Sequence, residues 1–367
     1  MSSPREPNPR LLRRLRQRLL AWYDANRRDL PWRDTGDGYR VLVSEFMLQQ
    51  TRVSTVLPYF DRLLERFPDM DSLARATDEE VRTAWTGLGY YRRARSLHAA
   101  ARAVVGEHGG LLPREPAELR ELPGVGEYTA AALASIIHDQ PEAVMDGNVI
   151  RVLTRLTADD RPVERAGTRG DLATLAGRLL APDRAGDWNQ AVMELGALVC
   201  TPRSPDCGAC PWSRDCLAAD GSPESYPVKK KAAPARRTHR AVGVFRRRGA
   251  VLLLRRNDPS LLDGTWELPG LDVASPADAA RDLAADLTRR LGTAVTVGAE
   301  IATVDHSITT RRIRVAAFEA ECRPLPRKRR DAREWVTEGE GLPMSSMTTK
   351  LLSRLASRHR DEPQDRN

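Results

Sequence analysis

The sequence predicts a mainly α-helical protein with a second, smaller α+β domain at its C-terminal end. From residue 1 to about residue 216, apolar residues recur three and four positions apart, and short Gly or Pro breaks separate the segments. From residue 240 to residue 367 the period changes, and short strand-like stretches surround one amphipathic segment. A chain of 367 residues is long enough for two or three domains with cores of their own.

The composition describes a globular and basic protein. Hydrophobic residues make up 41% of the chain, charged residues 29%, and the formal net charge is +8. A basic balance favours an anionic partner, most often nucleic acid, although a generic basic surface gives the same charge. The N-terminus is too charged for a signal peptide, and no apolar run approaches membrane-spanning length. We therefore expect a cytoplasmic protein without a membrane partner.

The helical elements follow one another with few interruptions. The first is amphipathic, with Leu11, Leu15, Leu19 and Trp22 at helical spacing. The same spacing predicts further helices at residues 78–85, 92–105, 130–137 and 148–156.

The stretch SEFMLQQT, residues 44–51, places Glu45 inside an apolar helical segment. A carboxyl group among apolar side chains has a raised pKa and can hold a proton near neutrality. Such a group is suited to general acid catalysis. A glutamate at a helix edge that reaches water is the alternative that this segment alone leaves open.

The segment ELPGVGEYTAAALASII, residues 121–137, combines a proline and two glycines with a following helix. The glycines permit a tight turn, and the N–H groups of Val125, Gly126 and Glu127 would then lie at a helix N-terminus. That arrangement attracts phosphate. An ordinary turn between two helices gives a similar pattern.

Four of the five cysteines, Cys200, Cys207, Cys210 and Cys216, fall within 17 residues, and Cys322 stands alone. In a chain without an export signal, this clustering indicates a metal site rather than disulfides. Four thiolates on a short loop can hold a metal ion or an iron–sulfur cluster. Structural zinc sites usually pair two Cys-x2-Cys units, and this loop has one.

A segment rich in Pro, Ser, Ala and cations follows the cysteines. Residues 227–240 hold six Lys or Arg and no acid, which predicts a surface linker that lies along phosphates or is simply solvated. Beyond it, the pattern predicts strands within residues 241–256, 295–304 and 311–320, and a helix within residues 274–292.

These motifs, in this order, resemble the MutY-type adenine DNA glycosylases of the endonuclease III, or helix-hairpin-helix, superfamily. The resemblance rests on SEFMLQQTRVSTVLPYF, GLGYYRRARSLHAAA, LPGVGEYTA, MDGNVIRVL and the four cysteines. It is strong from about residue 11 to residue 216 and weaker beyond. It implies a two-lobed helix-hairpin-helix glycosylase domain at residues 1–216, with the hairpin at about 117–137 and a loop for one [4Fe–4S] cluster at 200–216. A basic linker at 217–239 and a Nudix-like lesion-recognition domain at 240–367 complete the chain.

The resemblance also implies an activity, the excision of adenine paired with 8-oxoguanine or guanine in duplex DNA. By matching, Glu45 is the general acid and Asp146 stabilises the positive charge that develops on the sugar. Alone, Asp146 would be interpreted as a helix N-cap. Tyr128 packs beside Asp146, and Asn148 hydrogen-bonds around the abasic sugar. The implied enzyme is a bacterial, nucleoid-associated monomer that binds double-stranded DNA.

Further residues are implied to contact DNA or the extruded base. Arg28, Trp32 and Gln190 line the adenine pocket, Gln50 enters the duplex opposite the flipped base, and Tyr90 wedges between base pairs with two leucines beside it. These leucines are Leu48 and Leu88, and core packing is the alternative role for Tyr90 and Leu88. The full set outside the catalytic group is Arg28, Trp32, Leu48, Gln50, Thr51, Leu88, Tyr90, Gly124, Val125, Gly126 and Gln190.

In the C-terminal domain, many family members carry Phe-Ser-His in a turn that probes the oxidised base. Ile308, Thr309 and Thr310 fall at these three places when the sequences are aligned on His306, and Ser307 is a further candidate contact. Thr309 keeps a hydroxyl like that of serine, whereas Thr310 lacks the histidine ring. We therefore expect a preference for 8-oxoguanine over guanine that is weaker than with the full motif.

Two arginines argue against a hydrolase activity in this domain. Arg289 and Arg290 stand where Nudix hydrolases have a pair of metal-binding glutamates. Two cations do not hold Mg²⁺, so a reader of DNA, or a generic partner-binding domain, is predicted instead.

Two other functions remain as alternatives. An endonuclease III-type enzyme removes oxidised pyrimidines and cuts the strand through a lysine Schiff base. Here that position holds Tyr128, which predicts hydrolysis without strand cleavage. A non-catalytic iron–sulfur DNA-binding protein would leave unexplained why Glu45, Tyr128 and Asp146 all match catalytic positions.

Overall fold

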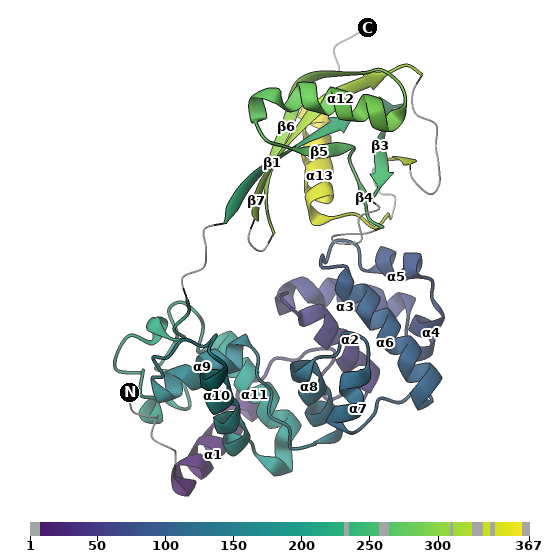
Figure 1. The fold of residues 1–367 in the computed structure, drawn as a ribbon. Helices are drawn as coiled ribbons and strands as arrows, with labels where there is room; N and C mark the ends of the chain where they lie inside the picture. Colours follow the sequence, from purple (N-terminus) through teal and green to yellow (C-terminus); the bar gives the residue numbers. More distant parts are fainter. Residues whose placement is uncertain are drawn as a thin grey trace. The chain divides into compact units, whose positions relative to one another are not determined.

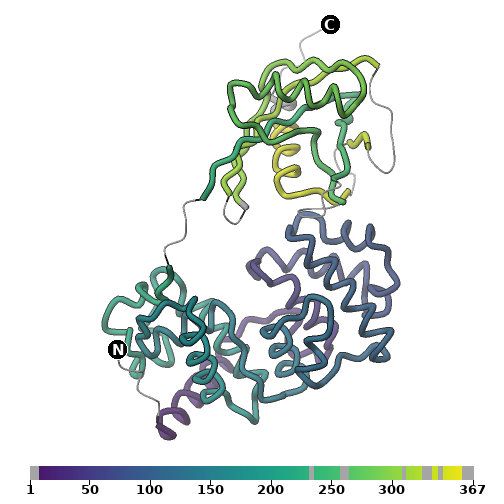
Figure 2. Tube along the Cα trace, in the orientation of Figure 1, coloured from purple at the N-terminus to yellow at the C-terminus, as the bar shows by residue number. Residues whose placement is uncertain are grey.

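The computed structural model describes residues 8–230, 235–256, 264–308, 311–324, 333–337 and 342–361. The chain divides into two compact units, which Figure 1 and Figure 2 trace in colour along the sequence. The first, or helical, unit comprises residues 1–76 and 96–232, and the second, or sheet, unit comprises residues 77–95 and 233–367.

Helices dominate the helical unit within its described residues, in agreement with the predicted fold class. Polar side chains cap several of them, and Asn8, for example, accepts a hydrogen bond from Leu11 N–H at 2.9 Å. The helices are α1 (Pro9–Asn26), α2 (Gly38–Leu48), α3 (Val53–Arg66), α4 (Met70–Arg75), α6 (Arg92–His108, whose first turn belongs to the sheet unit), α7 (Pro116–Glu121), α8 (Glu127–His138), α9 (Gly147–Thr157), α10 (Ala166–Leu179) and α11 (Ala185–Leu198).

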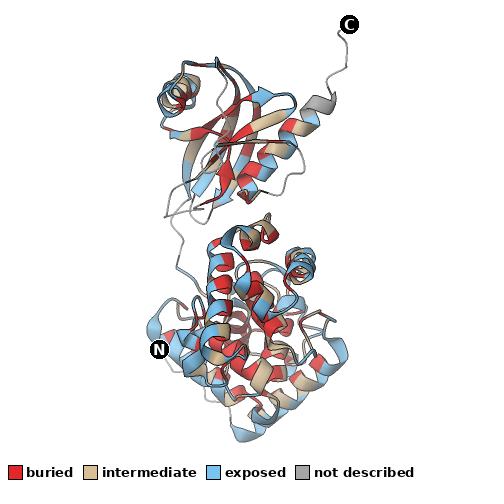
Figure 3. Cartoon of the chain, turned by 90° about the vertical axis from the view of Figure 1, so that its right-hand side faces the viewer, coloured by how far each residue is buried: buried red, intermediate tan, exposed pale blue. Residues whose placement is uncertain are grey.

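Helix α11 lies at the centre of one core of the helical unit. It packs against α1, α8 and α9, and the apolar stripe predicted for α1 is buried there at Leu15 and Leu19. Trp188 and Leu195 of α11 belong to the same core. In Figure 3, the buried residues of this unit, in red, lie mainly along the inner sides of its helices, and the exposed residues, in pale blue, lie along their outer sides.

Both ends of the predicted linker belong to folded segments. Leu217 N–H donates to the carbonyl of Leu156 at 3.0 Å, and the carbonyl of Val228 accepts from Val163 N–H at 3.1 Å. At the other end, strand β1 begins at Arg236. The basic stretch at residues 227–240 therefore contributes to both units rather than serving as a connection along its whole length.

The sheet unit contains two sheets and three longer helices among its described residues. One sheet has the strand order β5-β1-β7-β6, with β1 and β7 parallel, and the other joins β2, β3 and β4, with β8 paired to β3. The elements are α5 (Asp78–Ala84), β1 (Arg236–Val244), β2 (Arg246–Arg247), β3 (Ala250–Arg255), β4 (Trp266–Glu267), β5 (Gly270–Val273), α12 (Ala279–Leu291), β6 (Val295–Ile308), β7 (Arg311–Cys322), β8 (Arg333–Val336) and α13 (Ser346–Asp361).

Helices α12 and α13 cover opposite faces of the larger sheet (Figure 1). Successive residues of a strand point to opposite faces, and Ala241 of β1 packs in a core with Leu287 of α12. Its neighbour Val242 packs in a separate core with Leu351 of α13. This arrangement confirms the predicted α+β character of the C-terminal region.

None of the helices in the described part of the chain combines the length and apolar character that a bilayer crossing requires.

Candidate active site

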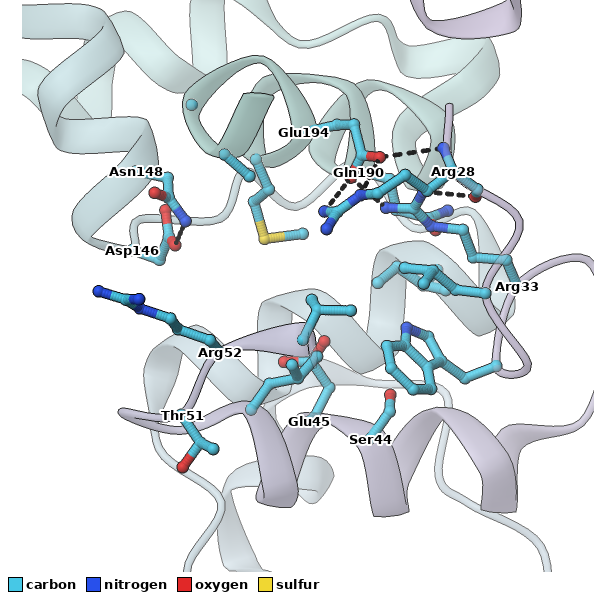
Figure 4. Close-up of a pocket in the computed structure, with 18 of the residues that line it drawn as sticks. Arg28, Arg33, Ser44, Glu45, Thr51, Arg52, Asp146, Asn148, Gln190 and Glu194 are labelled. Atoms are coloured by element: carbon cyan, nitrogen blue, oxygen red, sulfur yellow. Dashed lines mark hydrogen bonds and ion pairs between the residues drawn. The ribbon is translucent and has the colours of Figure 1, made fainter. Parts of the chain in front are cut away.

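A cavity of about 600 Å³ opens in the helical unit and is shown in Figure 4. Its walls come from the loop before α2, from α2 itself, and from α8, α9 and α11. Nine of the predicted site residues line this one cavity although they are spread over more than 160 positions of the chain: Arg28, Trp32, Glu45, Leu48, Thr51, Tyr128, Asp146, Asn148 and Gln190.

Glu45 points from α2 into the cavity (Figure 4) and is only 6% exposed. Burial raises the pKa of its carboxyl group to about 7, the Tyr128 hydroxyl partly offsets this rise, and the charge of Asp146 adds to it. Its neighbours Phe46 and Met47 are fully buried. The carboxyl group is therefore protonated in a large fraction of molecules at neutral pH.

Asp146 approaches the cavity from the opposite side, at the N-terminus of α9 (Figure 4). Its Oδ1 accepts a hydrogen bond from Val149 N–H at 2.7 Å, and its Oδ2 accepts one from Asn148 Nδ2 at 2.9 Å. Burial raises the pKa of Asp146, whereas these hydrogen bonds and the charge of Arg151 oppose that rise. The N-cap interpretation and the catalytic one are thus compatible, since the contacts that cap α9 also favour the ionised carboxylate.

Tyr128 of α8 adds a neutral hydroxyl to the cavity. It donates a hydrogen bond to Met193 Sδ at 3.3 Å. Burial raises the pKa of Tyr128 well above its ordinary value, and the nearby charges of Glu45 and Asp146 add to this rise. The phenol therefore stays protonated at neutral pH.

Glu194 of α11 is an acid of the cavity that was not among the predicted site residues, and it is bound by two arginines. Arg28 donates to Oε1 from Nε at 2.7 Å and to Oε2 from Nη2 at 2.8 Å, and Arg33 donates to Oε2 at 2.8 Å. Burial alone would raise the pKa of Glu194, but the hydrogen bonds from both arginines outweigh it and lower the pKa to about 2. Glu194 thus fixes the orientation of Arg28, a predicted wall of the adenine pocket.

Glu194, like Glu45, is a single acid within an apolar helical segment. The segment AVMELGALV, residues 191–199, places one acid in the middle of an apolar helix. What the local pattern lacks is the pair of arginines, which approach from more than 160 residues away in the sequence.

Arg52 and Arg151 are two further cavity residues that sequence reasoning missed. Arg52 is exposed at the start of α3, and Figure 4 shows its guanidinium directed toward Asp146. Arg151 donates from Nη2 to Asn148 Oδ1 and from Nε to the carbonyl of Cys200, both at 2.8 Å. It therefore joins the α9 side of the cavity to the loop that carries the cysteines.

The turn before α8 has the geometry that its glycines predict. Gly124 has a φ of +79°, and a Cβ at this position would lie 2.4 Å from Cβ of Ser96, so a side chain does not fit. Gly126 is the N-cap residue of α8, and Val125 is buried. The exposed N-terminus of α8 is consistent with the predicted phosphate contact.

Three predicted DNA-contacting residues lie outside the cavity lining. Gln50, in the helical unit, is exposed and has a φ of +59°. Tyr90, in the sheet unit, is 47% exposed with a φ of +50°, and the guanidinium carbon of Arg93 lies 5.2 Å from its ring centroid. Leu88, in the same unit, is buried at 6% exposure, which favours core packing for this residue.

The four clustered cysteines surround a common cavity in the helical unit. Within the described residues, no three His, Cys, Asp or Glu side chains come close enough to hold a single metal ion. Four thiols that line one cavity can hold a metal ion or an iron–sulfur cluster. Arg155, 1% exposed, donates to Cys200 Sγ at 3.3 Å and brings a positive charge to the site.

The predicted reader residues are described only in part. Ser307 is exposed near the end of β6, and Ile308 pairs with Arg311 of β7. Thr309 and Thr310 lie outside the described residues.

On α12, the arginines predicted to exclude a metal bind a neighbouring acid. Arg289 and Arg290 donate to the two carboxylate oxygens of Asp286. Arg290 also donates to the carbonyl of Gly270 at 3.1 Å.

Comparison with known proteins agrees with this architecture. Residues 43–169 match the HhH-GPD superfamily of base excision DNA repair proteins, residues 200–216 the iron–sulfur binding domain of endonuclease III, and residues 241–354 the NUDIX domain. The structure of a thermostable thymine-DNA glycosylase superimposes with a TM-score of 0.52 at 28% identity, covering 57% of this chain and 96% of that one.

Two curated relatives, both named adenine DNA glycosylase, fix the family. The mouse protein is 40% identical over 311 residues, 70% of this chain, and this match spans 60% of the mouse protein's own length. The Mycolicibacterium smegmatis protein is 43% identical over 258 residues, which cover 68% of this chain and 84% of the relative. The chain therefore belongs to the adenine DNA glycosylase family.

Proposed function

We propose that the protein excises adenine mispaired with 8-oxoguanine or guanine from duplex DNA by hydrolysis, without cutting the strand. The observation that carries this proposal is the position of Glu45 and Asp146 on opposite sides of one cavity. One carboxyl group can hold a proton at neutral pH, and the other is hydrogen-bonded in a way that favours its charge. These are the two properties that breaking a nucleoside C–N bond requires.

The reaction follows from these two groups. Glu45 donates its proton to a ring nitrogen of the extruded adenine, so that the C–N bond breaks and its electron pair leaves with a neutral base. Positive charge develops at C1′ of the sugar, and the Asp146 carboxylate stabilises it. A water molecule then adds at C1′ and loses a proton to the Glu45 carboxylate, which leaves an abasic site and restores the acid.

The cavity residues around Glu194 support recognition of a purine. Glu194 holds Arg28 in one orientation, and Gln190 lines the same cavity with an amide that can donate and accept hydrogen bonds. Trp32 is 7% exposed and packs edge-on against Phe60, with ring centroids 5.0 Å apart. A fixed aromatic side and a few oriented polar groups are typical of a site for a planar base.

The hydroxyl of Tyr128 supports a monofunctional enzyme. A Schiff base needs an amine at this position, and a phenol with a raised pKa is a poor nucleophile. The endonuclease III-type alternative would need a different nucleophile in the cavity, and none of the residues that line it is a lysine.

An excision assay with three opposing bases tests the proposed function. We expect adenine release opposite 8-oxoguanine and guanine but not opposite cytosine, with strand breaks only after hot alkali. Because the histidine of the reader motif is replaced, the preference for 8-oxoguanine over guanine should be about two- to tenfold weaker than in relatives with the full motif. Cleavage without alkali at oxidised pyrimidines would favour the lyase, and binding without any excision would favour the non-catalytic alternative.

We also propose that the cysteine loop holds one [4Fe–4S] cluster through Cys200, Cys207, Cys210 and Cys216. When bound, the cluster would supply a rigid centre that orders the loop, and Arg155 offsets part of the thiolate charge.

The purified protein should be yellow-brown, with about four irons per chain. Cys200→Ser should lower iron content because it removes one of the four thiol ligands. It should also weaken DNA binding, because a disordered loop would disturb the bond between the carbonyl of residue 200 and Arg151. Cys322→Ser is the matched control, since that cysteine is buried in the sheet unit and should leave iron content unchanged. One zinc per chain without sulfide would contradict the assignment.

A further inference from the structure

Four arginines at one end of the larger sheet lie opposite one another in neighbouring strands. In the parallel pairing of β1 and β7, Arg236 is opposite Arg311 and Arg237 is opposite Arg312. All four are exposed. Like charges directly across two strands destabilise a sheet, so this pairing is unfavourable unless an anion accompanies it.

No acidic side chain provides that compensation within the described part of the chain. None of the four arginines forms an ion pair there, and the nearby carboxylate of Asp272 is paired instead with Arg240 at 3.0 Å. Arg240, the next arginine along β1, also binds Glu267 at 3.0 Å and is almost buried. Arg240 therefore has a structural role, which these four arginines lack.

Three of the four surround a groove of about 390 Å³. Arg236, Arg237 and Arg311 line it, and we call it the sheet-end groove. Thr238 and His239 add hydrogen-bonding groups to its lining, and Asp272 adds a carboxylate whose charge is paired with Arg240. Guanidinium groups bind phosphate oxygens in a bidentate manner, so the groove has the chemistry of a phosphate site.

Arg311 of the groove lies on β7, and β7 pairs with β6, the strand that carries a predicted reader residue. Ser307 of β6 is opposite Arg312 of β7, and Ile308 is opposite Arg311. A phosphate held at this end of the sheet would therefore lie close to a base examined by Ser307. This places the phosphate on the DNA strand that carries the base opposite adenine.

We propose that the sheet-end groove binds the phosphodiester backbone of the strand opposite the target adenine, through Arg236, Arg237 and Arg311. The choice of strand rests on the proposed function, whereas the affinity for DNA backbone does not. The groove would position that strand by its phosphates and leave the reading of the base to other residues.

Salt titration of DNA binding by the full-length protein tests the groove. The triple variant Arg236→Gln/Arg237→Gln/Arg311→Gln should bind undamaged and mispaired duplexes more weakly, and its slope of log affinity against log salt should fall by about one per arginine removed. Three single Arg→Lys exchanges keep the charge and should retain most of the slope. Because like-charge pairs are removed, the thermal midpoint of the triple variant should not fall.

Control variants separate the groove from net charge. The triple variant Arg281→Gln/Arg289→Gln/Arg323→Gln removes as much charge from other exposed positions of the sheet unit and should change the salt slope much less. Equal slopes for the two triple variants would overturn the proposal. So would competition by micromolar nucleoside triphosphate with an unchanged salt slope, because the groove would then be a nucleotide site.

Neutral methylphosphonate linkages identify the strand. Placed beside the base opposite adenine, they should weaken binding by the wild type and have little further effect on the groove variant. Placed in the adenine strand, they should affect both proteins equally, and the reverse pattern would overturn the choice of strand. If the wild type releases no adenine, the proposed function fails, while the salt slopes on undamaged DNA still decide whether the groove binds backbone.

Discussion

Glu45→Gln is expected to abolish adenine excision while leaving binding to a mispaired duplex nearly intact. The amide preserves the shape of a side chain that is only 6% exposed, but it cannot donate the proton that the leaving base needs. General acid catalysis is typically worth about 10²–10⁴-fold in rate. Single-turnover excision and equilibrium DNA binding, measured on the same duplex, separate the two effects.

The pH dependence of the wild type tests the same group. A general acid must be protonated, and burial raises the pKa of Glu45 to about 7. The single-turnover rate should therefore fall as the pH rises through about 7. Glu194→Gln is a suitable contrast, because the pKa of Glu194 is lowered to about 2 and that group does not change charge in this range. It should disturb Arg28 and weaken substrate binding while keeping the fall near pH 7.

Protein stability should respond to Glu45 in the same direction. The folded protein holds this proton up to a pH of about 7, whereas an ordinary glutamate loses it near 4.5. Between these values the folded state binds more protons, so the stability contributed by this group is lost as the pH rises. The thermal midpoint of Glu45→Gln relative to the wild type should therefore be higher at about pH 8 than at about pH 5. Two results would remove Glu45 from the mechanism. One is a Glu45→Gln excision rate within a few-fold of the wild type, and the other is a wild-type rate that does not fall as the pH rises through about 7.

Much of the fold was predictable because it depends on local periodicity. The spacing of Leu15 and Leu19 is that of a helix with one buried face, and both are buried in α1. The change to strand-like alternation near residue 240 likewise reflects the two-sided burial of β1, where Ala241 and Val242 enter different cores. Local patterns of this kind do not reveal that residues 77–95 associate with the sheet unit, because that depends on tertiary contacts.

The candidate site was predictable where one motif carries its own chemistry. The acid of SEFMLQQT is unusual within its own apolar segment, whereas Asp146 and Asn148 were assigned through the family resemblance. All three residues, Glu45, Asp146 and Asn148, line one cavity. Glu194 differs because its state depends on Arg28 and Arg33, which are distant in sequence. An acid among apolar residues can be protonated or doubly paired, and only the fold decides between them.

The arginine pairs of the sheet unit illustrate the same limit. The sequence shows Arg236-Arg237 and Arg311-Arg312 as two separate basic dipeptides about 75 residues apart. Their meaning depends on a parallel pairing in strict register, which places each arginine opposite another. Strand register between distant segments is set by tertiary packing rather than by either segment alone.

Asp146→Asn should reduce excision by at least about 10²–10³-fold with little loss of stability. Asparagine is as good an N-cap as aspartate, so its side-chain oxygen can still accept the hydrogen bond from Val149 N–H that begins α9. What disappears is the negative charge that faces the developing cation at C1′. Binding to an abasic product should persist, because the cavity keeps its shape.

The same substitution should also change the titration of Glu45. The charge of Asp146 contributes to the raised pKa of Glu45, so its removal should move the fall in residual activity to lower pH. Asp146→Ala provides the matched comparison, since it loses both the charge and the cap. It should be as inactive as Asp146→Asn but less stable by about 1 kcal/mol, measured by denaturant unfolding. Near-normal activity of Asp146→Asn, combined with instability of Asp146→Ala, would reduce Asp146 to a helix cap and leave the sugar cation without its stabilising charge.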